Sequence, residues 1–85
     1  MAANLKSISN IELNIGDIVH FYGARFEIYS AAMFPEIDVV RNPNGPYMVA
    51  MGKWIDGEII NGYFGPNKDW NFQGNKLAKV AIEVA

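Results

Sequence analysis

Residues 18–30 read IVHFYGARFEIYS, and this stretch decides the fold. Strand-favouring residues fill 18–22 and 25–30, and Gly23-Ala24 lies between them. Glycine at the first central position is typical of a type II′ turn, so the stretch predicts a β-hairpin. Side chains alternate between the two faces of a strand. The predicted core-facing set is Val19, Phe21, Phe26 and Ile28, and the predicted outer set is His20, Tyr22, Glu27 and Tyr29.

Further strand patterns flank this hairpin. Apolar and polar residues alternate over 11–15 and over 77–84, and each run predicts a short strand. Asp56-Gly57 is a favoured type I′ turn, so residues 47–55 and 58–64 are predicted to form a second hairpin around it. Residues 65–76 are predicted to be irregular.

Three prolines interrupt residues 31–46 and exclude a long helix there. Residues 37–41 fit either a short strand or a single helical turn, and residues 42–46 read as a turn. One short helical turn is therefore the most helix that the chain is expected to contain.

The expected fold is all-β. Five or six short antiparallel strands must protect their edges, and curling into a small barrel does so best. We therefore predict an SH3-like barrel of five or six antiparallel strands. A two-layer roll with one short helix within 31–41 is the alternative. A chain of 85 residues indicates a single domain, 1–85, in which residues 1–10 are expected to form a loosely ordered extension.

Composition narrows the function classes. The net charge is −2 and the basic residues are scattered, which disfavours binding to a phosphate backbone. The chain has no cysteine, which excludes a disulfide framework, cysteine-ligated zinc and a thiol nucleophile. No apolar run approaches the roughly 18 residues of a membrane span, and the N-terminus lacks the apolar stretch of a signal peptide. A cytoplasmic protein without a membrane partner is expected.

Catalytic patterns are weak. His20 is the only histidine, and it has neither a recognisable nucleophile nor an orienting carboxylate in a known motif. The carboxylate pairs Asp56 with Glu58 and Glu36 with Asp38 read as solvated turns, with too few ligands for calcium. We therefore predict no catalytic residue, no metal and no cofactor, and a protein that is not an enzyme.

The aromatic residues are the most informative feature. The chain has four Tyr, five Phe and two Trp, and a barrel of this size buries about half of such rings. The rest are expected on the surface or against a partner, where Tyr and Trp dominate binding hot spots. Trp70 and Phe72 also fit a second role, as a plug at the open end of a barrel. The candidate partner-binding residues are Tyr22, Tyr29, Trp54, Tyr63 and Trp70.

Four strings carry a family resemblance: Gly-Asp-Ile-Val at 16–19, Tyr-Gly-Ala-Arg-Phe at 22–26, Gly-Tyr-Phe-Gly-Pro at 62–66 and Trp-Asn-Phe-Gln-Gly-Asn at 70–75. With them the chain resembles small uncharacterised β-barrel proteins encoded in bacteriophage and prophage genomes, over roughly 15–84. The resemblance implies a phage gene product made in the cytoplasm of a bacterial host. It transfers no catalytic residues.

The expected function is a non-enzymatic module that binds a host or phage protein through an aromatic face. One form of it is an inhibitor of a host defence system, of the anti-CRISPR or anti-restriction kind, as the resemblance, the small size and the acidity indicate. The alternatives are a small barrel that binds nucleic acid on stacked Tyr and Trp, and a minor structural protein of the virion. Self-association is also expected, through edge strands near 11–15 or 77–84 or through the aromatic face.

Overall fold

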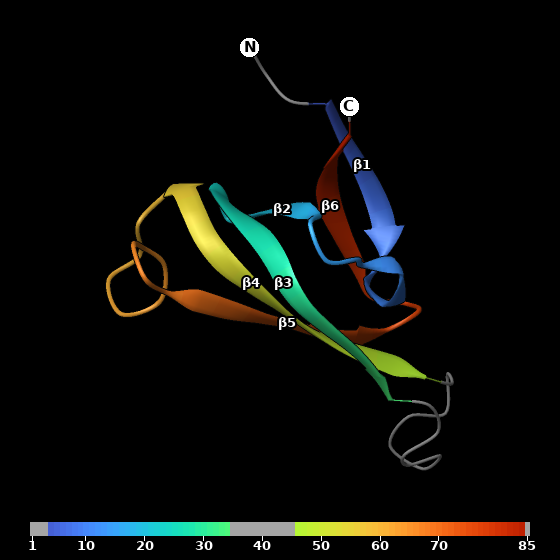
Figure 1. The fold of residues 1–85 in the computed structure, drawn as a ribbon. Coiled ribbons are helices and arrows are strands. Elements are labelled where there is room, and N and C mark those ends of the chain that lie inside the picture. Colours follow the sequence, from blue (N-terminus) through green and yellow to red (C-terminus); the bar gives the residue numbers. More distant parts are fainter. Residues whose placement is uncertain (1–3, 35–45, 85) are drawn as a thin grey trace.

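The computed structural model describes residues 4–34 and 46–84, which form an all-β fold (Figure 1). This confirms the predicted class, with six strands and one short 3₁₀ turn. Residues 37–41, and residues 42–45 of the predicted turn, lie outside the described residues. The elements are β1 (Asn4–Ser9), η1 (Asn10–Glu12), β2 (Ile18–Phe21), β3 (Ala24–Phe34), β4 (Tyr47–Gly57), β5 (Asp69–Asn75) and β6 (Lys79–Val84).

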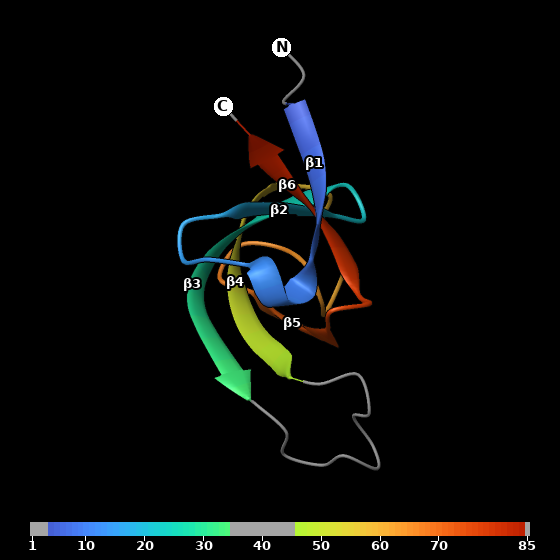
Figure 2. The ribbon, with the colours of Figure 1, turned by 90° about the vertical axis from the view of Figure 1, so that its right-hand side faces the viewer.

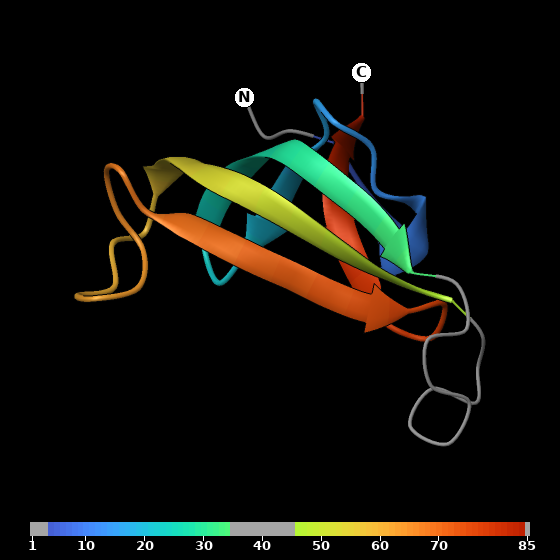
Figure 3. The same cartoon turned by 60° about the horizontal axis from the view of Figure 1, so that its bottom comes forward.

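The six strands form one antiparallel sheet in the order β1-β6-β2-β3-β4-β5. β3, β4 and β5 run side by side (Figure 3), and β1 and β6 lie together at a steep angle to them (Figure 1). The sheet is not closed, so the SH3-like barrel is not confirmed. β6 lies between β1 and β2, so the predicted exposed edge at 77–84 is wrong, and β1 and β5 form the edges.

β1 occupies most of the segment that was expected to be a loosely ordered extension. It pairs along its whole length with β6, from Asn4 opposite Val84 to Ser9 opposite Lys79. Ile8 is buried in the core beside the partly buried Val80 of β6. Sequence analysis did not predict this strand, because Ile8 is its only apolar residue buried in the core and a single buried residue makes no recognisable pattern.

The predicted hairpin is present, but its turn lies one residue earlier. Phe21 pairs with Ala24, and the two central residues, Tyr22 and Gly23, have φ values of 49° and 80°. Positive φ at both positions is the geometry of a type I′ turn, not of the predicted type II′ turn. The core-facing set is confirmed, since Val19, Phe26 and Ile28 are fully buried and Phe21 packs against them.

Asp56-Gly57 does not form the predicted hairpin turn. β4 continues through it, and Gly57 pairs with Ala24. At Gly57 φ is 97°, and a side chain there would overlap the carbonyl oxygen of Gly23 and lie 2.8 Å from the Cα of Ala24. Glycine is needed because β4 passes directly over the β2–β3 turn. The predicted return strand at 58–64 is absent from the described structure, in which only an isolated bridge joins Ile60 and Phe64.

On the side away from β3, β4 pairs with β5, which lies in the segment predicted to be irregular. Phe72 is buried, and Trp70 packs partly buried against the core. Gly52 of β4 makes this close packing feasible, because a Cβ there would lie 2.9 Å from the Phe72 ring and 3.0 Å from the Phe26 Cβ. Trp70 and Phe72 therefore lie on a paired strand and do not plug the end of a barrel.

Residues 11–15 do not form the predicted strand. Leu13 is buried, whereas Ile15 is 69% exposed. The chain instead turns through η1, which lies across β4 and β5 (Figure 2). The buried side-chain amide of Asn10 donates to the carbonyl oxygens of Met48 at 3.3 Å and Phe72 at 3.4 Å. η1 therefore ties the β1 end of the curled sheet to its β4–β5 end.

Two β-bulges bend the long β3–β4 pair. The register shifts once between Arg25 and Phe26, where Ile55 is the extra residue of β4, and once between Ile28 and Ser30, where Tyr29 is the extra residue of β3. Bulges increase local twist, so they help the sheet to curl.

Candidate binding groove

An apolar cavity of about 220 Å³ opens beside the β2–β3 turn. We call it the aromatic groove. Three of the five predicted partner-binding residues meet there, from three different parts of the chain. Its described lining residues are Phe21, Tyr22, Ile60, Tyr63, Phe64 and Trp70.

The floor of the groove is continuous with the core. The Phe21 ring lies 5.9 Å from both the Phe64 and the Trp70 rings, measured between centroids, and Phe64 meets Trp70 edge-on at 5.0 Å. Phe64 is buried and also packs against the core residue Phe26 at 5.1 Å. Edge-to-face aromatic packing of this kind restrains ring positions, so the floor is preorganised.

One exposed wall is Tyr22. The residue is 74% exposed, and its ring meets the Phe21 ring edge-on at 4.5 Å. Neighbouring strand residues normally point to opposite faces, and this is why Tyr22 was predicted to lie beside His20. The positive φ of Tyr22 turns its side chain to the Phe21 side instead. The prediction of its face is therefore wrong.

The opposite wall is a tight turn between β4 and β5. The amides of Tyr63 and Phe64 both donate to the carbonyl oxygen of Ile60 at 2.8 Å. This turn leaves Tyr63 60% exposed and Ile60 40% exposed, with the Tyr63 ring 6.3 Å from that of Trp70.

Glu58 lies beside the β2–β3 turn that carries Tyr22. Its amide donates to the carbonyl oxygen of Gly23 at 3.1 Å, and its side chain lies over Gly23, where an added Cβ would be 2.6 Å from the Glu58 Cγ. The predicted binding residue Trp54 is not among the lining residues. Trp54 is partly buried, and its Nε1 donates to the carbonyl oxygen of Glu58 at 3.1 Å, so it helps to fix the Glu58 backbone.

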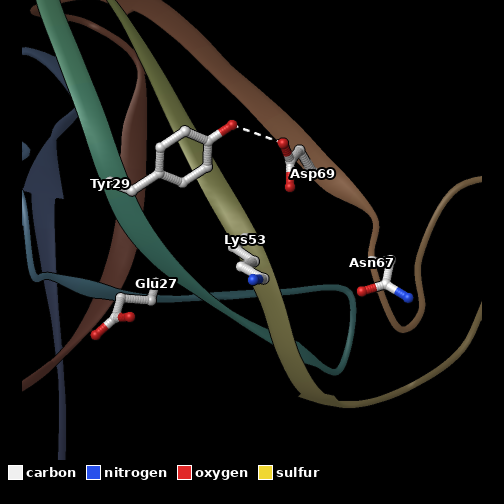
Figure 4. Close-up of a pocket in the computed structure, with 5 residues that line it drawn as sticks. All are labelled: Glu27, Tyr29, Lys53, Asn67 and Asp69. Carbon is white, nitrogen blue, oxygen red and sulfur yellow. Dashed lines mark hydrogen bonds between the residues drawn. The ribbon is translucent and has the colours of Figure 1, made fainter.

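Tyr29 lies in a different depression, on the outer face of the sheet (Figure 4). Its hydroxyl donates to Asp69 Oδ2 at 2.6 Å. This hydrogen bond, with smaller contributions from desolvation and the Asp69 charge, raises the pKa of Tyr29 above its ordinary value. Strand pairing places Lys53 between Glu27 and Asp69. This surface is therefore polar and charged, unlike the aromatic groove.

A second polar cluster surrounds Arg25 on the same sheet. Its guanidinium donates to Glu83 at 2.9 Å and to Asp56 at 2.7 Å. The hydrogen bond to Glu83, followed by that to Asp56, raises the pKa of Arg25 above its ordinary value. The Nε2 of His20 is buried, lies 3.7 Å from Glu83 Oε2 and has no hydrogen-bond partner among the described residues.

The described residues contain neither a cluster of metal-ligating side chains nor a long apolar helix. Among residues 4–34 and 46–84, no three His, Asp or Glu side chains gather in a way that could hold an ion. Within the same ranges, no helix has the length and apolar character needed to cross a bilayer.

Three lining residues were not predicted as binding residues: Phe21, Ile60 and Phe64. Phe21 was assigned to the core, and Ile60 and Phe64 to a return strand. The Gly62–Gly65 spacing around Tyr63 was the available signal for a turn here, since both glycines have positive φ. No family model, no curated protein and no solved structure matches the chain.

Proposed function

We propose that the protein is a non-enzymatic, phage-encoded module that binds a host or phage protein through the aromatic groove. The observation that carries the proposal is the conformation of Tyr22. A left-handed backbone costs most residues roughly 1–2 kcal/mol, whereas glycine and asparagine adopt it readily. A strained, bulky residue that is 74% exposed is better explained by contact with a partner than by folding.

The chemistry of the groove supports a protein ligand. Its lining combines exposed Tyr and Trp surface with a preorganised floor, which is the composition of binding hot spots. Ile59, 65% exposed, adds aliphatic surface next to Ile60. Inhibition of a host defence system is a specific form of this proposal, supported by the resemblance to phage-encoded proteins, the small size and the net charge of −2.

The charge arrangement favours a protein over a nucleic acid as partner. Arg25 is engaged by two carboxylates, and Lys53 has Glu27 and Asp69 as cross-strand neighbours. A salt titration of DNA and RNA binding tests the alternative, since phosphate contacts weaken steeply with salt. Mass spectrometry of purified phage particles tests the virion alternative.

The direct test is affinity purification of tagged protein from bacterial cells, with groove and control variants side by side. The double variant Tyr22→Asn/Tyr63→Ala removes both exposed walls. The variant Tyr29→Phe changes an exposed tyrosine of the other face. We expect one specific protein to be recovered with the wild type and with Tyr29→Phe but not with the double variant. Equal recovery by the double variant, or a strictly monomeric protein without a specific partner, would overturn the proposal.

A further inference from the structure

We infer that the aromatic groove receives an arginine side chain of the partner, with the guanidinium packed against the Tyr22, Tyr63 and Trp70 rings and its edge facing Glu58. This inference rests on the proposed function and names the chemistry of the ligand at the same site.

The rings provide the attraction. Five of the six lining residues are aromatic and contribute rings to the walls or floor of one cavity: Phe21, Tyr22, Tyr63, Phe64 and Trp70. The face of an aromatic ring attracts a cation, and arginine is the protein cation that most often stacks on one. None of the six lining side chains carries a charge, so none of them repels an incoming cation.

The apolar lining distinguishes arginine from lysine. A lysine ammonium is a compact and strongly hydrated charge, so it would lose water in this cavity without gaining enough hydrogen bonds. A guanidinium is planar and weakly hydrated, and its faces can stack while its edge stays at the open rim. The cavity of about 220 Å³ is open to solvent, so this placement leaves the edge accessible.

Glu58 supplies the complementary charge. Its side chain lies over Gly23, beside the turn residue Tyr22, and its backbone is fixed by hydrogen bonds to Gly23 and Trp54. A carboxylate pairs well with the edge of a guanidinium. The excess of acidic over basic residues in the chain acts in the same direction over longer distances.

The test uses three capped tripeptides, Gly-X-Gly, in which X is arginine, citrulline or leucine. Citrulline has nearly the shape of arginine without its charge. Binding to the full chain is followed by NMR, through the ring resonances of Tyr22 and Tyr63 and the indole N–H of Trp70. We expect the arginine peptide to bind about two- to fivefold more tightly than the citrulline peptide, as an exposed cation–π contact allows.

Variants localise the effect. Glu58→Gln should weaken the arginine peptide and leave the leucine peptide unchanged, and Tyr29→Phe should change neither. Equal or tighter binding of citrulline or leucine, or groove resonances that do not respond to the arginine peptide, would overturn the inference. If a captured partner still depends on the groove residues in that case, the proposed function stands and only the arginine assignment fails.

Discussion

The rings of Phe21 and Tyr22 meet edge-on with their centroids 4.5 Å apart, although the two residues are consecutive in the chain. An extended strand would send them to opposite faces. The left-handed φ of Tyr22 brings both rings to one side, and there they form part of the aromatic groove. The left-handed torsion of Tyr22 therefore makes its ring a wall of the groove; in an extended conformation the ring would lie on the opposite face of the sheet.

The strain at Tyr22 is testable by comparing two substitutions. Both Tyr22→Asn and Tyr22→Ala remove the ring, but only asparagine tolerates the left-handed conformation well. We expect Tyr22→Asn to be more stable than Tyr22→Ala by about 1 kcal/mol. Urea denaturation measures the difference, and equal stabilities would show that the turn is not strained.

Asn10 is expected to be the most important polar side chain for stability. Asn10→Ala leaves the hydrogen bonds to the Met48 and Phe72 carbonyl oxygens unmade in a buried place, which costs about 1–3 kcal/mol. The control is Asn14→Ala, because the side-chain amide of Asn14 donates to the carbonyl oxygen of Glu12 on the exposed surface. A loss below about 0.5 kcal/mol is expected for the control. Similar losses for both variants would contradict the role of η1 in joining the sheet ends.

Gly57 is expected to tolerate no side chain. Gly57→Ala introduces both left-handed strain and an overlap with the Gly23 backbone. Gly62→Ala isolates the strain, because φ is 87° there and nothing lies within 4 Å of an added Cβ. We expect a cost of about 1 kcal/mol for Gly62→Ala and at least about 1 kcal/mol more for Gly57→Ala. Thermal or urea unfolding of both variants measures this, and equal costs would mean that β4 does not press on the β2–β3 turn.

Tyr29 should titrate above the usual tyrosine pKa. Its neutral hydroxyl donates to Asp69, so the pKa in the folded state is raised above the unfolded value of 10.0. The stabilisation from this hydrogen bond is present below that unfolded pKa and is lost as pH rises through the folded pKa. An NMR titration of the Tyr29 ring measures the shift. Asp69→Asn should move the pKa back toward 10, and an unchanged value would show that the hydrogen bond is not its cause.

The sequence was sufficient to predict the all-β class and the buried residues of the first hairpin. Val19, Phe26 and Ile28 alternate with polar residues, and a period of two specifies which side is buried. It also identified Tyr22, Tyr63 and Trp70 as candidates, because their residue types are those of binding hot spots.

Only the tertiary structure decided which strands pair and which residues meet in the aromatic groove. Asp56-Gly57 has the local preference of a turn, yet contact with the Gly23–Ala24 backbone keeps it within β4. β1 has little apolar pattern and is held by its pairing with β6. Trp70 meets Phe21 across 49 positions of sequence. Local propensity contains no information on such long-range contacts, so the groove exists only once the curled sheet brings these residues together.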